Sequence, residues 1–173
     1  MQFVWITNCN MQNAINQGVE KLSERIFGML DREATVQSAK RFLMEYQDWK
    51  IEAARFTLSL QSPVISDMPS APSHDNTQEN TIVGKANAQF ECSIRLNTIH
   101  LMGSIDDDNA LLADLLEYRF INGWRVKKVC ERLAEKYDLG YLAERTYNDY
   151  QNKALWTFAI VCPISSVRVK KVR

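Results

Sequence analysis

Residues 111–159 read LLADLLEYRFINGWRVKKVCERLAEKYDLGYLAERTYNDYQNKALWTFA and carry the clearest structural pattern in the chain. Apolar side chains recur every three or four residues here, which indicates helices with one buried face. The turn sequences Asn122-Gly123 and Asp138-Leu139-Gly140 interrupt this periodicity twice. The pattern therefore predicts three helices, over 109–121, over 124–137, and from Ala143 or Glu144 to 159.

A helix, a glycine-containing turn and a second helix with a polar outer face form the pattern of a helix-turn-helix. In such a unit the first residues of the second helix enter the major groove of DNA. Arg pairs with guanine and Asn with adenine through two hydrogen bonds each, and Lys side chains of the preceding helix lie near phosphates. The candidate DNA-binding residues are Arg145, Thr146, Asn148, Asp149, Asn152, Lys153, Lys127 and Lys128. Periodicity alone fits a simple helical bundle equally well.

Upstream, the same periodicity predicts helices over 12–28, 32–60 and 82–102. The apolar stripe of 32–60 suits a coiled coil or, more commonly, packing against a neighbouring helix. For 82–102 we expect the buried side to consist of Val83, Ala86, Phe90, Ile94 and Leu101. Asp31 stands where a helix N-cap is expected. The consecutive acids Asp106, Asp107 and Asp108 favour a helix start over a metal site, since adjacent side chains diverge.

The segment 61–81 carries three of the four prolines and few apolar residues, which predicts a linker or surface loop. The sequence thus indicates an all-α protein with N-terminal helices over 1–60, which are a possible dimerisation or partner-binding region. A helical domain over 82–163 follows, with its helix-turn-helix at about 124–159. The last ten residues, 164–173, form a basic tail. Short basic tails are more often solvated termini than functional segments, so we expect a solvated terminus here.

Composition limits the function. The 21 basic and 21 acidic residues balance, whereas most stand-alone DNA-binding proteins are basic. Cys9, Cys92, Cys130 and Cys162 are too scattered for a zinc site and are expected to be reduced, mostly buried thiols. His74 and His100 have no catalytic partners at informative spacing, so we expect no enzyme, metal or cofactor. No apolar run spans a bilayer, which predicts a cytoplasmic protein without membrane contact.

The segment 115–159 resembles region four of bacterial sigma factors, and AERTYNDYQNKAL (143–155) is its most specific part. A longer stretch, about 30–163, resembles the ArpU family of phage transcriptional regulators through the helix after Asp31, the SPVISDMP linker (62–69) and the middle helix. The resemblance implies a phage or prophage regulator that activates late genes, or genes affecting autolysin export, in a bacterial host.

Three features depart from this resemblance. Residues 1–29 lie outside it, Ala143 replaces a capping serine, and the connection 136–142 is slightly long. The last two leave the start of the recognition helix open. Double-stranded DNA is the expected partner, together with host RNA polymerase and a second copy of the chain as further candidates. Two alternatives stay open: a DNA-packaging protein of the small-terminase type, and a helical module that contacts RNA polymerase without reading DNA.

Overall fold

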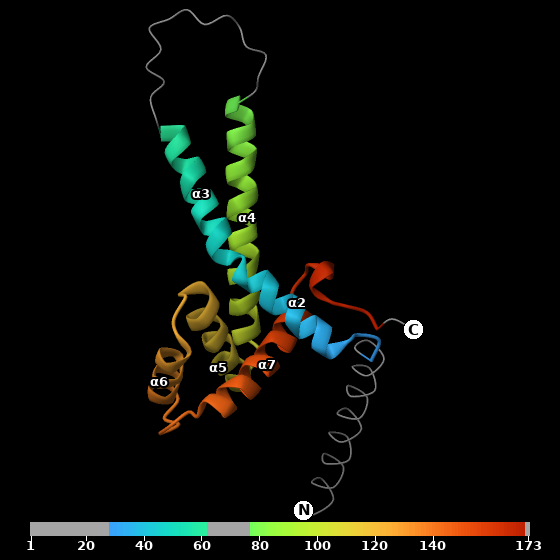
Figure 1. Ribbon diagram of the computed structural model, residues 1–173, viewed down its shortest axis with the longest axis vertical. Coiled ribbons are helices and arrows are strands. Elements are labelled where there is room, and N and C mark those ends of the chain that lie inside the picture. The colour runs from blue at the N-terminus through green and yellow to red at the C-terminus, as the bar shows by residue number, and fades with distance from the viewer. Residues whose placement is uncertain (1–27, 62–76, 172–173) are drawn as a thin grey trace, which may run out of the picture.

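The computed structural model describes residues 28–61 and 77–171 of the 173-residue chain. Their helices are α2 (Arg32–Met44), α3 (Tyr46–Gln61), α4 (Thr77–Gly103), α5 (Asp107–Leu116), α6 (Val126–Lys136) and α7 (Glu144–Val161), with a π-helical turn η1 (Glu117–Ile121) and a 3-10 turn η2 (Ser165–Val167) (Figure 1). Strand pairing in this part of the chain is limited to one bridge between Leu30 and Lys170. The all-α prediction is confirmed. Residues 1–27 and 62–76, with most of the predicted first helix and linker, lie outside the described residues.

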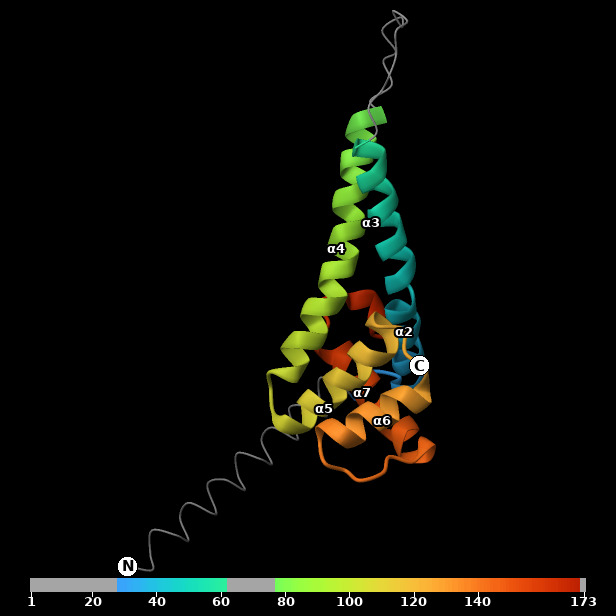
Figure 2. The ribbon, with the colours of Figure 1, turned by 90° about the vertical axis from the view of Figure 1, so that its left-hand side faces the viewer.

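The helices form two parts: an arm, which is the hairpin of α3 and α4, and a base, which consists of α2, α5, α6 and α7. Helices α3 and α4 run side by side as a long hairpin, and α2, α5, α6 and α7 gather around the lower half of α4 (Figure 2). Asp31 and Asp106 cap the starts of α2 and α5 by accepting backbone N–H bonds from Ala34 (3.0 Å) and Asn109 (2.7 Å), as predicted. None of the described helices is both long enough and apolar enough to cross a membrane.

One hydrophobic core joins the two parts of the chain that the sequence separates. Val36, Ala39, Leu43 and Tyr46 of the N-terminal part pack into the same core as the buried side chains of α4, α5, α6 and α7. Accordingly, α2 lies against α7, and α3 lies against α4. The predicted boundary at 61–81 therefore falls within a helical hairpin, not between two structural units. Helix α4 also begins at Thr77, inside the predicted linker.

The helix predicted over 32–60 is in fact two helices, which meet at Glu45. Beside this break, the guanidinium of Arg95 is fully buried and lies 3.8 Å from the ring centroid of Phe42. Its Nε donates to the Phe42 carbonyl (2.8 Å), and its terminal nitrogens bind the carboxylates of Glu91 (2.6 Å) and Glu45 (3.1 Å). The carbonyls of the last turn of a helix lack partners within it, so Arg95 satisfies one where α2 ends.

The expected buried face of 82–102 is wrong. Val83, Phe90 and Leu101 are more than half exposed, and Ala86 is exposed as well. The face that packs inward carries small and polar residues as well as large apolar ones. It comprises Gly84, Ala88, Arg95, Thr98, Ile99 and Met102. Small residues permit close packing, since a Cβ on Gly84 would lie 2.5 Å from the ring of Phe56 in α3.

The C-terminal segment is built into the fold, contrary to the reading as a solvated tail. Val167 is buried, and Val169 pairs with Asp31 through a backbone hydrogen bond of 2.8 Å. Arg168 donates to the carbonyls of Ala159 (3.2 Å) and Cys162 (2.6 Å), at the end of α7. A cation there stabilises the negative end of the helix dipole. Lys170 and Lys171 remain exposed.

Candidate nucleic-acid interface

Helix α6 is fixed to α5 at its C-terminal end. The ammonium of Lys136 and the hydroxyl of Tyr137 both bind the carboxylate of Asp114, the hydroxyl at 2.7 Å. Burial, and then the bond to Asp114, raise the pKa of Tyr137 well above its usual range. The two contacts fix the angle at which α6 leaves the core, which matters because α6 is the first helix of the candidate pair.

The start of α6 is held by the π-helical turn η1. Gln47 of α3 donates to the carbonyls of Phe120 (3.2 Å) and Ile121 (2.7 Å), which lie at the end of this turn. Arg119 donates to the carbonyl of Trp124 (2.9 Å). Between these contacts Gly123 adopts a φ of 68°, a conformation that costs other residues energy. The turn predicted at Asn122-Gly123 is confirmed.

The connection from α6 to α7 runs from Tyr137 to Ala143 and is longer than the three or four residues of a compact helix-turn-helix. Asp138 and Gly140 reverse the chain with φ values of 50° and 68°. Helix α7 begins at Glu144, within the predicted range, and Ala143 provides no side-chain cap. The long connection and the missing side-chain cap are therefore both present in the structure, and α7, the candidate recognition helix, starts at Glu144.

The predicted DNA-binding residues of α7 share an outward face. The core side chains Tyr147, Ala154, Leu155 and Phe158 fix the orientation of the helix. The opposite side exposes Arg145, Asn148, Asp149, Asn152 and Lys153, while Thr146 is half-buried. The repeat of three or four residues gives a continuous polar strip along the first half of the helix.

The two predicted lysines of α6 are exposed but point to different places. Lys127 lines the groove between α6 and the start of α7, next to Glu131 and Glu144. The ammonium of Lys128 lies 3.9 Å from the ring centroid of Trp124, which stacks on Tyr118 at 5.0 Å. Lys127 is therefore the better placed of the two to act together with α7.

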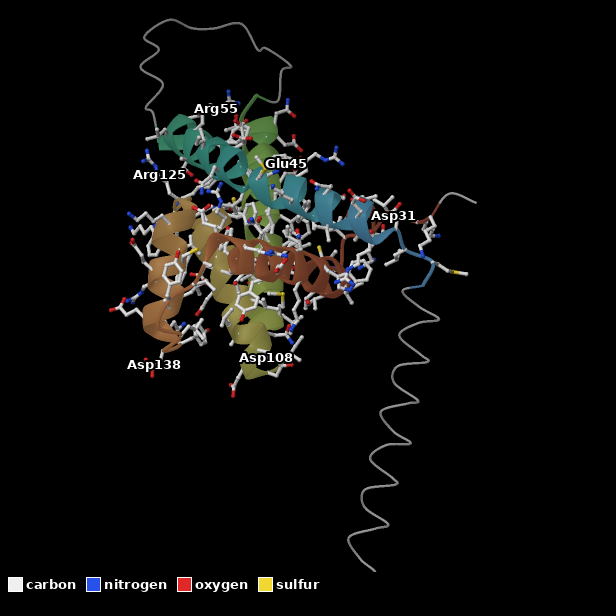
Figure 3. The ribbon with its side chains drawn as sticks, turned by 60° about the horizontal axis from the view of Figure 1, so that its bottom comes forward. Asp31, Glu45, Arg55, Asp108, Arg125 and Asp138 are labelled. Carbon is white, nitrogen blue, oxygen red and sulfur yellow. The ribbon has the colours of Figure 1, made fainter. Side chains whose placement is uncertain are left out.

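Sequence reasoning missed the contribution of α2. Helices α2 and α7 run antiparallel (Figure 3), as shown by Arg32 lying over the ring of Trp156 at 5.5 Å. This arrangement places Lys40 beside Asn148 and Gln151, in a cavity of about 480 Å³ that Arg119 also lines. Two cations thus flank the polar strip of α7. Lys40 is more than a hundred positions away in sequence, so no local pattern could connect it with α7.

Acidic residues border the other side of α7. A cavity of about 690 Å³ lies between α6 and the start of α7, with an apolar floor that includes Cys130, Ala134 and Leu142. Its charged rim consists of Glu131, Glu135, Asp138 and Glu144, with Lys127 as the one base among the lining residues. The candidate interface therefore has a basic side towards α2 and an acidic side towards α6.

Comparisons with protein-family models, with curated proteins and with solved structures found no match. In the described part of the chain, no three His, Cys, Asp or Glu side chains are grouped as a metal site requires. Cys92, Cys130 and Cys162 are free thiols, and the last two are buried, whereas Cys9 lies outside the described residues. His74 also lies outside them. His100 lies on the surface, 3.8 Å from Glu117.

Proposed function

We propose that this protein is a transcription regulator that binds double-stranded DNA through the exposed face of α7. One observation carries the proposal: the first half of α7 has its polar side free, directly after a helix and a turn. Arg145, Asn148, Asn152 and Lys153 supply the donors that base edges and phosphates accept. The resemblance to phage regulators of the ArpU family adds the biological setting, which is control of phage late genes or prophage genes in the bacterial cytoplasm.

The charges of the site imply modest affinity for a single copy. On α7, Arg145 and Lys153 are balanced by Glu144 and Asp149. Lys40 and Arg119 add positive charge at the α2 side of the strip. Since phosphate neutralisation supplies most non-specific affinity, one molecule binds weakly. A second copy, or RNA polymerase bound next to it, would raise the affinity.

The experiment has two steps. A duplex is first selected from a random-sequence pool with the full-length protein, and fluorescence anisotropy then compares it with a scrambled duplex over a salt series. The double variant Arg145→Ala, Lys153→Ala should lower the affinity and reduce the log–log salt slope by about one to two. Arg55→Ala, on the far end of the hairpin arm, is the matched control and should change neither value. A wild-type salt slope near zero would exclude the proposed interface.

The acid-rimmed groove favours a second candidate function, binding of a basic protein segment such as one from RNA polymerase. An apolar floor with four acids on its rim suits an amphipathic, positively charged partner helix. The readout is retention of RNA polymerase by the immobilised protein. Two results together would favour this candidate over DNA binding: the protein selects no duplex, and it retains RNA polymerase in a way that Glu131→Lys abolishes.

A further inference from the structure

The outer face of α4 carries a long apolar stripe that the described residues leave open. Val83, Phe90 and Leu101 are 52%, 57% and 59% exposed, and Ile94 lies between them. They face away from α3, which packs on the opposite side of α4 at Gly84. Figure 2 shows α4 along the outer edge of the molecule, with α3 on its other side.

The stripe carries no formal charge between residues 82 and 101. Its polar members are Asn87, Ser93 and Asn97, which are neutral. The charged residues of this part of α4 lie off the stripe, and Arg95 and Glu91 bind each other on the inner side. Monomeric proteins rarely expose a continuous apolar surface of this kind without a use for it. The absence of charge favours a protein partner over a nucleic acid.

The order of residues along the stripe is symmetric about the level of Cys92 in the helix, although the Cys92 side chain itself packs against the core on the inner side. Val83 and Leu101 stand at equal distances on either side of it, as do Asn87 and Asn97, and Phe90 and Ile94. A two-fold axis at Cys92 would therefore align two antiparallel copies of α4 so that each apolar residue meets an apolar residue. It would also bring each Asn amide next to an amide of the other copy. An interface between identical subunits requires such self-complementarity.

The surface beside the stripe offers a place for the exposed phenylalanine. A shallow groove of about 280 Å³ runs along Phe90, Ile94, Asn97 and Leu101 and is closed on one side by Val161 and Pro163 at the end of α7. Around an axis at Cys92, Phe90 of one copy lies opposite Ile94 of the other, at this groove. The protruding ring and the groove thus match in position as well as in chemistry.

From these observations we infer that the protein forms a two-fold symmetric dimer through antiparallel pairing of α4 with α4 of a second copy. The dimer contact lies along α4 and the end of α7 and does not involve the first half of α7, so it can be tested separately from DNA binding. It also differs from the dimerisation region expected over residues 1–60, because the contact lies on the other side of the hairpin. The stripe from Val83 to Leu101 extends about 27 Å along the helix.

Sedimentation equilibrium of the full-length protein tests the assembly state. We expect a dimer, and we expect Phe90→Glu to weaken it by about 30-fold or more, because Phe90 occurs twice in the interface. Ile51→Glu is the matched control, since Ile51 is 67% exposed on α3, and it should leave the dimer unchanged. A monomeric wild type or a ring-sized oligomer would overturn the inference, as would a dimer that Phe90→Glu does not weaken.

A charge pair tests the register. Phe90→Lys and Ile94→Glu should each weaken the dimer, and the chain that carries both should regain at least about tenfold, because opposite charges then meet across the axis. Thermal melting checks that each variant is folded. If both single variants are folded and the double variant does not regain dimer affinity, the result would contradict this register.

A crosslink tests the direction of the two helices. In a Cys9→Ser, Cys92→Ser background, the double variant Val83→Cys, Leu101→Cys should form a disulfide-linked dimer on mild oxidation, since these positions face each other across the axis. Val83→Cys alone should not crosslink, because its two copies would lie about 27 Å apart. Efficient crosslinking of the single variant would show parallel helices and would overturn the antiparallel dimer.

Discussion

Arg95 of α4 and Phe42 of α2 are joined twice, by the 2.8 Å bond from Nε to the Phe42 carbonyl and by the guanidinium lying 3.8 Å from the ring centroid. The contact ties the end of α2 to the middle of α4, at the point where α2 gives way to α3. Glu45 and Glu91 bind the rest of the guanidinium, so this buried cation is fully paired. The contact therefore sets the angle between base and arm.

Arg95→Met should lower the free energy of unfolding by about 3 kcal/mol, because it leaves the Phe42 carbonyl and the Glu91 carboxylate without their donor. Urea denaturation measures the change. Glu45→Gln is the control, since the Glu45 side chain is half exposed and its amide oxygen still accepts from Arg95; it should cost less than about 1 kcal/mol. Equal losses in the two variants would contradict the role given to the carbonyl.

Arg168→Met should cost about 1–2 kcal/mol, because the carbonyls of Ala159 and Cys162 lose a charged donor at the end of α7. Hydrogen exchange should speed up in the last turn of α7 and in the segment around Val169, while the start of α7 is unchanged. Lys170→Met removes a neighbouring exposed charge and should leave both regions unaffected. If hydrogen exchange in Arg168→Met speeds up equally along the whole of α7, that result would contradict a local capping role.

Burial raises the pKa of Tyr147 to about 12, above its ordinary value of 10.0. Below pH 10 this tyrosine is neutral in the folded and the unfolded protein, so its contribution to stability is fully present. Between pH 10 and 12 the unfolded chain releases the proton first, and stability falls as the pH rises. Tyr147→Phe should reduce the slope of unfolding free energy against pH over this interval. An unchanged slope in Tyr147→Phe would show that the hydroxyl is not buried in solution.

Lys40→Ala tests the part of the interface that comes from α2. If DNA passes along α7 on the side of Asn148, the variant should lower affinity for all duplexes to a similar degree and reduce the salt slope by about one. Lys85→Ala, on the arm, removes an equal charge as the control. A loss confined to the selected duplex would instead place Lys40 at a base edge.

The helices of the candidate site were predictable because their signals are local. Two glycine turns and a repeat of apolar residues give α6 and α7 with bounds close to those observed. The inner face of α4 was not predictable in this way. It packs through Gly84, Ala88, Arg95 and Thr98 as well as Ile99 and Met102, whereas Val83, Phe90 and Leu101 lie outside. Periodicity identifies the more apolar face of a helix, which here is not the face turned to the core of its own chain.

The basic tail and Lys40 show a second limit. Arg168 and Val169 have partners at the end of α7 and the start of α2, and Lys40 reaches α7 only through the fold. The positions of charged residues in the sequence do not indicate such contacts. They depend on the packing of helices that are distant in sequence.

The pairing of Thr35 and Asp31 with Val169 also has a consequence for synthesis. The two partners are separated by 134 positions between Thr35 and Val169. At about 5–20 residues per second, on the order of ten seconds pass on the ribosome after Thr35 is made before Val169 is added. During that time α2 has neither α7 nor the final segment to pack on, so its apolar side stays uncovered. The nascent chain therefore cannot complete this part of its core until Val169 has been added.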